Sequence, residues 1–370
     1  MTTILILGGY GYTGRLLARH LLEQSKAQII LAGRSLEKAQ TLADQLNTDF
    51  KGKRVTAVRV DAADATSLKS ALRGVDLLLV AAPLTSAPPE TVIRTALEAG
   101  VDYLDVQLGA QKFALLQSLA EEIKRKKLCF ITEAGFHPGL GAALVRYAAA
   151  LLDAIERAVV VGYLNLGKTF PPYTESVNEL IELFKDYQAQ VYKNGAWTKP
   201  GSYDMRKIDL GGDIGRKLCY SMFFEELRPL PELYPSLKEV GFYMSESHWM
   251  TDFVIMPLVW LIIKIAPRSP RPSGKLLWWS MGKFHKPPYR VELQVQASGL
   301  KNGKPARVQA SVSHPDGYEL TAVPVVTLLL QYLEGSAKRP GLWMMGHLAE
   351  PARLMKDMER MGVKVSTVVE

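Results

Sequence analysis

A glycine-rich turn near the start of the chain constrains its fold more than any other feature of the sequence. In ILILGGYGYTGRLLARHLLEQ (residues 4–24), an apolar run typical of a strand buried on both faces precedes four glycines, and apolar residues at helical spacing follow. Glycine lets the backbone approach a pyrophosphate and the helix lie close to the strand, and the helix N-terminus faces the anion. The alternative is a structural turn that binds no nucleotide. The residues expected to contact a dinucleotide are Gly8, Gly9, Gly11, Tyr12, Thr13 and Gly14.

The residues after the second predicted strand indicate which dinucleotide is bound. The apolar run of residues 29–32 ends where an NAD-binding domain would carry Asp or Glu for the ribose 2′-hydroxyl. This chain has Arg34 and Ser35 there, with Lys38 one turn further on. A guanidinium can hold a 2′-phosphate through two charge-assisted hydrogen bonds, so the pattern favours NADP(H). The alternative is a solvated Arg34, with Ser35 only capping the next helix.

Strands and helices then alternate as far as residue 136. This alternation predicts an α/β fold with a doubly wound parallel sheet. The predicted strands cover residues 54–62, 75–83, 101–106 and 128–136, and the predicted helices cover residues 63–74, 89–100 and 110–127. Ligands bind at the carboxyl ends of such strands. There we expect Asp61 to reach the adenine, and Ala82 and Pro83 to be small enough for the cofactor to lie across them.

The second half of the chain follows a different pattern. A strand at 157–167, a helix at 174–187, a hairpin around Asn194-Gly195 and alternating strands within 288–320 indicate an α+β domain. The tail has helical periodicity. The expected domains are an NADP-binding Rossmann domain at 1–150, an inserted substrate and dimerisation domain at 151–334, and a helical return onto the Rossmann domain at 335–370.

Composition restricts the cellular setting. The two cysteines, Cys129 and Cys219, lie in apolar surroundings and form neither a disulfide framework nor a metal-binding spacing. No targeting segment precedes the first predicted strand. We therefore expect a cytoplasmic protein without a metal site.

Five motifs spread along the chain share one likeness. They are GGYGYTGR (8–15), AGRS (32–35), AGVDYLDV (99–106), EAGFHPGL (133–140) and MERMGVKV (358–365). Together they resemble the saccharopine dehydrogenase-like, or saccharopine reductase, family. The resemblance implies an NADP-binding Rossmann domain with an inserted α+β domain. Some members reduce an imine between an amino acid and a carbonyl partner, others act on polyamine precursors, and others reduce lipid-linked substrates.

Hydride transfer needs a proton donor or acceptor beside the cofactor. The candidates are His137, whose usual pKa is near neutral, and Asp105, which ends a predicted strand. The alternatives are that His137 only hydrogen-bonds the loop backbone and that Asp105 caps a turn. Short-chain dehydrogenases need Tyr-x-x-x-Lys after the fifth strand, and neither Tyr103 nor Tyr147 has a lysine at that spacing.

Residues 249–290 combine apolar and basic character. Residues 253–263 are uncharged, too few to span a bilayer, and seven cations follow without any acid between Asp252 and Glu292. With Trp278 and Trp279, the pattern fits an interfacial segment on an anionic membrane. The alternative is a buried helix of a homodimer followed by a solvated basic loop. No nucleic-acid-binding module accompanies the basic residues.

The sequence therefore predicts an NADP(H)-dependent oxidoreductase acting either on a C=N bond of an imine or amino acid, or on an apolar enoyl-type substrate. Arg206, Arg216 and Arg228 are available for a substrate carboxylate, in no diagnostic pattern. The alternative from another class is a dinucleotide-sensing or scaffold protein without turnover.

Overall fold

The computed structural model describes residues 1–166, 173, 175–185, 188–199, 205–246, 248–266 and 269–370. The chain divides into two compact units. The first contains Met1–Gly139 and Thr321–Glu350, and the second contains Leu140–Leu320 and Pro351–Glu370. Each unit is built around its own β-sheet.

The first unit has a seven-stranded sheet in which every neighbouring pair is parallel. The order is β15-β6-β5-β4-β1-β2-β3, so the direction of winding reverses between β1 and β4. The crevice at such a reversal is where open α/β sheets bind ligands. The strands are β1 (Thr3–Leu7), β2 (Gln28–Gly33), β3 (Val55–Arg59), β4 (Leu77–Val80), β5 (Asp102–Asp105), β6 (Cys129–Thr132) and β15 (Gly341–Met344).

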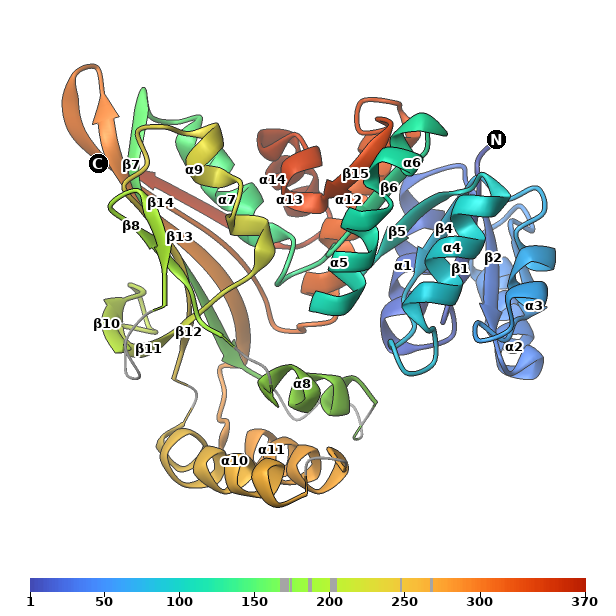
Figure 1. Cartoon of the computed structure of the whole chain (residues 1–370), viewed down its shortest axis with the longest axis horizontal. Coiled ribbons are helices and arrows are strands. Elements are labelled where there is room, and N and C mark those ends of the chain that lie inside the picture. The colour runs from blue at the N-terminus through green and yellow to red at the C-terminus, as the bar shows by residue number, and fades with distance from the viewer. Residues whose placement is uncertain (167–172, 174, 186–187, 200–204, 247, 267–268) are drawn as a thin grey trace. The chain divides into compact units, whose positions relative to one another are not determined.

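Helices connect these strands, as the alternating sequence pattern predicts. The expected doubly wound parallel sheet is confirmed (Figure 1). The helix expected over residues 110–127 is instead two helices joined at Leu119. The helices are α1 (Tyr12–Gln24), α2 (Leu36–Asp49), α3 (Ala65–Ala71), α4 (Pro89–Ala99), α5 (Ala110–Ser118), α6 (Ala120–Arg125), α12 (Glu319–Leu333) and α13 (Met345–Leu348).

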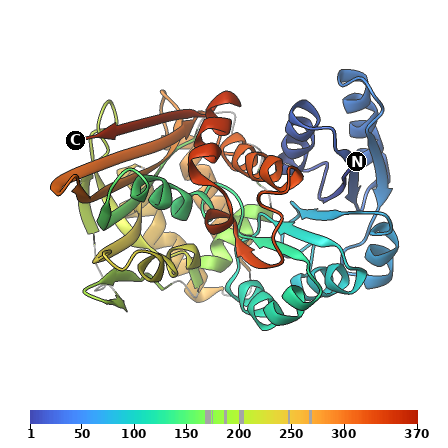
Figure 2. The same cartoon turned by 90° about the horizontal axis from the view of Figure 1, so that it is seen from above.

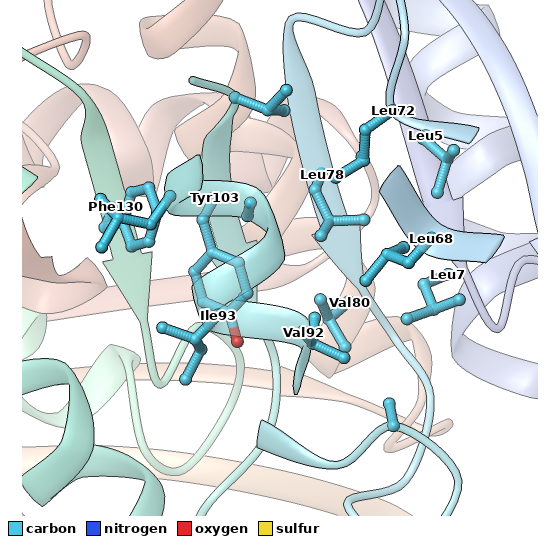
Figure 3. Close-up of a cluster of buried hydrophobic side chains, with 14 of the residues drawn as sticks. Leu5, Leu7, Leu68, Leu72, Leu78, Val80, Val92, Ile93, Tyr103 and Phe130 are labelled. Atoms are coloured by element: carbon cyan, nitrogen blue, oxygen red, sulfur yellow. The ribbon is translucent and has the colours of Figure 1, made fainter. Parts of the chain in front are cut away.

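The core of this unit comes from the apolar strand runs. All residues of β4 and of β6 are buried, as expected of central parallel strands. Figure 3 shows Leu5 of β1 and Leu78 of β4 in one cluster with side chains of α3 and α4. Tyr103 and Phe130 extend the cluster to β5 and β6, with ring centroids 5.2 Å apart. This packing fixes the strand ends that carry the candidate site.

A segment from late in the chain completes the sheet. β15 pairs with β6 in parallel, with Gly341 opposite Cys129. The Asp102 carboxylate accepts hydrogen bonds from the Cys129 amide (2.8 Å) and from the Tyr332 hydroxyl of α12 (2.5 Å). Lys338 lies 3.4 Å from the same carboxylate. The Asp102 carboxylate at the start of β5 thus holds α12 and the segment before β15 in place.

The second unit contains a nine-stranded mixed sheet. Its main path is β10-β11-β12-β7-β13-β14-β16, and the β8–β9 hairpin joins it through β12. Only the β12–β7 pair is parallel among these described pairs. The strands are β7 (Ala154–Asn165), β8 (Val191–Lys193), β9 (Ala196–Thr198), β10 (Met205–Asp209), β11 (Arg216–Met222), β12 (Glu239–Ser245), β13 (Arg290–Lys301), β14 (Lys304–His314) and β16 (Lys364–Val369).

The predicted antiparallel hairpins are confirmed. β8 and β9 turn at Asn194-Gly195, and β13 and β14 form a hairpin within the expected range. The expected ends at residues 167, 174, 186–187 and 200 lie outside the described residues. The helices are α7 (Leu140–Ala149), α8 (Glu175–Lys185), η1 (Glu225–Leu227), α9 (Leu230–Leu233), η2 (Thr251–Ile255), α10 (Met256–Ile265), α11 (Arg271–Phe284) and α14 (Pro351–Arg360). None of the helices within the described ranges has the length and hydropathy needed to cross a bilayer.

The C-terminal tail returns to the first unit only as far as residue 350, and it does so with a strand as well as a helix. Residues 321–350 belong to the first unit, where Gly341–Met344 is a strand, whereas α14 and β16 belong to the second. Figure 2 shows β16 alongside β14, with which it pairs antiparallel. The sequence KVSTVV is rich in β-branched residues, which favour strands. It pairs with the edge of β14 opposite to the edge that pairs with β13. The units therefore divide at residues 140, 321 and 351 instead of 151 and 335.

Candidate functional site

The glycine turn between β1 and α1 is shaped by close backbone contacts. Gly8 has φ +80°, and a Cβ there would lie 2.8 Å from the Ala82 amide nitrogen. A Cβ on Gly14 would lie 2.3 Å from the Gly8 carbonyl oxygen, and one on Gly9 2.9 Å from the Ile6 carbonyl oxygen. These three glycines are therefore required by the packing of β1, α1 and the end of β4, whatever the turn binds.

Gly11 is the exception in this turn. It is exposed, and a Cβ there would meet only the Gly8 carbonyl oxygen, at 3.1 Å. It is also the N-cap of α1, and it has no side chain with which to cap the helix. The first turn of α1 contains no acidic residue. The helix N-terminus thus keeps its positive end open to an anion, and a side chain at Gly11 would occupy the space above it.

Arg34 and Ser35 follow β2 at the same edge of the sheet. Ser35 caps α2, because its hydroxyl accepts from the Lys38 amide at 3.3 Å. The exposed Arg34 guanidinium lies 3.5 Å from the Ser86 hydroxyl, which is in the loop after β4. The Tyr10 hydroxyl accepts from the Ser35 amide (3.2 Å). Arg34 and Ser86 together offer hydrogen-bond donors to a phosphate, and Lys38 is exposed one turn along α2.

The remaining cofactor candidates lie at neighbouring strand ends. Asp61 is exposed after β3 and accepts from the Ala63 amide at 3.0 Å, so one of its oxygens is used in a local turn. Ala82 is small because Gly8 lies against it, a reason that does not involve a ligand. Its carbonyl accepts from the Gln107 side chain at 2.7 Å. Pro83 follows in the same half-buried loop.

Asp105 lies at the centre of a buried polar cluster. Its carboxylate and the Lys112 ammonium are both fully buried, 2.5 Å apart. The same carboxylate accepts from the Thr132 hydroxyl (2.9 Å) and from the amides of Gln107 (3.1 Å) and Glu133 (3.2 Å). Lys112 also donates to Thr132 and to the Gln107 carbonyl. Asp105 thus ties together the ends of β5 and β6 and the start of α5.

His137 lies in the loop after β6. The first residue of this loop, Glu133, donates its amide to the Asp105 carboxylate. The Ala134 amide also donates to the Asp105 carbonyl, at 3.0 Å. Desolvation by burial lowers the pKa of His137 to about 4, so its imidazole is neutral at pH 7. Its ring centroid is 4.3 Å from that of Phe136. The neutral imidazole carries no extra proton to donate, and a pKa of about 4 makes it a weak base at pH 7.

The three arginines of the second unit are engaged with carboxylates. Arg206 lies 2.6 Å from Glu239, Arg216 3.5 Å from Asp209, and Arg228 2.6 Å from Glu225. Arg228 also stacks over the rings of Trp197 and Phe223 and lines an open hollow of about 380 Å³. The three side chains therefore do not converge on one substrate carboxylate.

Sequence reasoning missed Lys112, Gln107, Tyr10 and Ser86. A signal for Lys112 was present: it shares a helix face with the buried Leu116, one turn further on. A lysine on the apolar face of a helix predicts a buried partner. The contacts of Tyr10 and Ser86 join separate strand ends, so no local pattern identifies them.

A parallel sheet in this order, with a glycine turn at its winding reversal, defines a dinucleotide-binding fold. Residues 4–129 match the family model described as the saccharopine dehydrogenase NADP binding domain. The whole chain resembles apo saccharopine dehydrogenase (L-Glu forming) from Saccharomyces cerevisiae, with a TM-score of 0.74, 14% identity and coverage of 100% of both chains. That likeness shows a shared fold.

Two curated proteins are similar in sequence to this chain. The chain is 25% identical to carboxynorspermidine synthase of Vibrio cholerae over 386 residues, covering 90% of this chain and 89% of the relative. It is 24% identical to carboxyaminopropylagmatine dehydrogenase of Synechocystis over 258 residues, covering 67% and 63% respectively. The resemblance drawn from the motifs is confirmed to this extent: residues 4–129 match the model of the saccharopine dehydrogenase NADP binding domain, and the chain has the fold of saccharopine dehydrogenase.

Proposed function

We propose that this protein is an NADP(H)-dependent oxidoreductase that transfers a hydride to or from the C=N bond of an imine formed by an amine. The proposed cofactor binding rests on the N-terminus of α1. Gly11 leaves this helix end without a side-chain cap, and no acidic residue lies in its first turn. The names of the two relatives, which denote carboxylated amines, support the substrate half.

Residues of the first unit would bind the cofactor and move the proton. The amides at the start of α1 would hold the pyrophosphate, and Arg34 with Ser86 would hold the 2′-phosphate. The bound nicotinamide would supply or accept the hydride. His137 would accept the proton released from an amine during oxidation, a role that requires the bound substrate to raise its pKa from about 4 toward neutrality.

We assign Asp105 a positioning role. Its carboxylate is fully buried and holds Lys112, Thr132 and two backbone amides at the ends of β5 and β6. Both of its oxygens accept hydrogen bonds within the chain, so the Asp105 carboxylate is engaged structurally instead of facing a substrate. We further propose that the second unit contributes the substrate site and a homodimer contact.

An apolar enoyl-type substrate is the second candidate. It is favoured by the exposed apolar side chains of α10, including Leu258, Leu261 and Ile265, and by the engagement of Arg206, Arg216 and Arg228 with carboxylates. A non-catalytic dinucleotide sensor is the third, and it would bind NADPH without oxidising it.

The test is a spectrophotometric assay of NADPH oxidation with two substrate panels. One panel pairs amino acids or diamines with aldehydes to form imines, and the other contains enoyl compounds. Turnover with the imine panel supports the proposal. Turnover with the enoyl panel alone would establish the second candidate, and tight NADPH binding without turnover in either panel would favour the sensor.

A further inference from the structure

The helices η2 and α10 of the second unit form a continuous segment with two unlike faces. Every fourth residue, namely Thr251, Ile255, Val259 and Ile263, is buried. Three of these pack in one cluster with Ile181 of α8 and with α11. Figure 1 shows α10 and α11 together, on the far side of α8 from the sheet of this unit. The inner face of the segment is therefore an ordinary core face.

The outer face is apolar as well, yet the fold leaves it exposed. Ile265 is 74% exposed, Phe253 53% and Leu261 52%. Trp249, at 62%, precedes this segment, and Trp279 of α11 is 53% exposed. Monomeric soluble proteins rarely expose large side chains in such density without a partner. We name Trp249, Phe253, Leu258, Leu261, Ile265 and Trp279 the outer apolar face.

Exposed cations accompany this face without any acid among them. Lys264 lies in the last turn of α10, and Lys275, Lys283 and Lys286 lie on or just after α11; all four are exposed. The sequence contains no Asp or Glu from residue 253 to residue 291. Arg290 is excluded from this set, because it pairs with Asp213 (3.0 Å) and Glu292 (3.2 Å). Residues 253–291 thus place positive charge beside the apolar face without any acid among them.

The exposed apolar side chains and the lysines together indicate which partner covers the outer apolar face. In a symmetric dimer formed through this face, the same lysines would meet across the axis with no carboxylate between residues 253 and 291 to pair with them, and Asp252 at the start of η2 is half-buried. An anionic lipid surface neutralises lysines and accepts aliphatic side chains beneath them, and tryptophan favours its headgroup region. The segment η2–α10, Thr251–Ile265, is too short to cross the hydrocarbon core.

We propose that the outer apolar face and its lysines bind the headgroup region of an anionic phospholipid bilayer, with η2 and α10 lying in the plane of the interface. This inference goes beyond the oxidoreductase activity and does not depend on it. The membrane would hold the second unit by two separable contributions. Lysines would act through Coulomb attraction, which salt screens, and the apolar side chains through burial, which salt does not screen.

The test measures sedimentation of the full chain with vesicles of phosphatidylcholine, either alone or containing phosphatidylglycerol. We expect binding to the anionic vesicles and much less to the neutral ones, with partial release at high salt. Changing Lys275, Lys283 and Lys286 together to Gln should weaken binding on the order of 100-fold, since each lysine near such a surface contributes about fivefold. The double variant Leu258→Gln/Leu261→Gln should lose at least about tenfold, and the loss should persist at high salt.

Matched controls lie elsewhere on the same unit. Leu233 of α9 is 53% exposed, close to the 52% of Leu261, so Leu233→Gln is the control for the single variant Leu261→Gln, which should weaken binding on its own. Lys207, Lys304 and Lys356 are also exposed, and changing them together to Gln removes the same net charge. Both controls should bind vesicles as the unchanged protein does. Circular dichroism and NADPH titration should be unchanged in every variant, which separates this test from that of the enzymatic proposal.

Three results would overturn the inference. One is an unchanged protein that stays in the supernatant with anionic vesicles at low salt. Another is a control lysine variant that loses as much binding as the test variant, which would indicate a response to net charge alone. The third is a dimer in analytical ultracentrifugation that the leucine double variant dissociates, with no vesicle binding, which would assign the face to a second copy of the chain.

Discussion

The buried ion pair between Lys112 and Asp105 gives the sharpest prediction of stability. Lys112→Met keeps the length and most of the volume of the side chain but removes the ammonium that bonds Asp105, Thr132 and the Gln107 carbonyl. Removing one partner of a buried pair costs about 3–5 kcal/mol, because the other charge is left uncompensated. Asp105 keeps three other donors, from Thr132 and two backbone amides, so the cost should lie near the lower end, about 3 kcal/mol.

The assay is urea unfolding of the full chain followed by circular dichroism, with hydrogen exchange of the β5 and β6 segments to localise the effect. The control is Lys124→Met on α6, where an exposed lysine should change the unfolding free energy by less than about 0.5 kcal/mol.

The variant Asp105→Asn/Lys112→Met removes both charges and should be more stable than the sum of the single effects predicts. A loss of less than about 1 kcal/mol for Lys112→Met, or strict additivity in the double variant, would refute the assignment of this pair as an essential buried contact.

Two further predictions concern the glycine turn and the loop after β6. Gly11→Val should abolish binding of NADPH and NADH with little change in thermal stability. Gly14→Val should destabilise the fold itself, because its Cβ would meet backbone atoms at 2.3–2.9 Å. Calorimetry measures the affinities and thermal unfolding the stabilities, and retained cofactor affinity in Gly11→Val would contradict the anion site at α1. Because the pKa of His137 falls from 6.5 unfolded to about 4 folded, the unfolded state binds more protons between these values. Stability should therefore decline as the pH is lowered through this range, by up to about 3 kcal/mol, and His137→Gln should flatten this dependence in urea unfolding measured against pH; an equal decline in both proteins would contradict it.

The first unit was predictable because its signals are local. A buried strand, a glycine turn and an amphipathic helix follow one another within residues 4–24, and each later strand–helix repeat carries its own periodicity. The cation at Arg34 was readable for the same reason, since it stands directly after β2.

The C-terminal pairings were not predictable in this way, because they join distant residues. Gly341 pairs opposite Cys129, and Val369 opposite Val308, so nothing in the tail itself specifies its partner strand. The Asp102 anchor for Tyr332 likewise spans 230 positions. The role of Asp105 depends on Lys112 and Thr132, which only the folded sheet brings together. A strand-end carboxylate looks the same in sequence whether it faces a substrate or a buried lysine.

Calorimetric titration of NADPH and NADH into the unchanged protein and into Arg34→Asp tests whether this edge of the first sheet binds NADP(H). We expect NADPH to bind the unchanged protein at least tenfold more tightly than NADH. Arg34→Asp should then lose at least about tenfold in NADPH affinity with little change for NADH, since one charge-assisted contact contributes about 1.5–3 kcal/mol. Equal affinities in the unchanged protein, or equal weakening of both cofactors in the variant, would contradict the assignment of this edge of the sheet as an NADP(H) site.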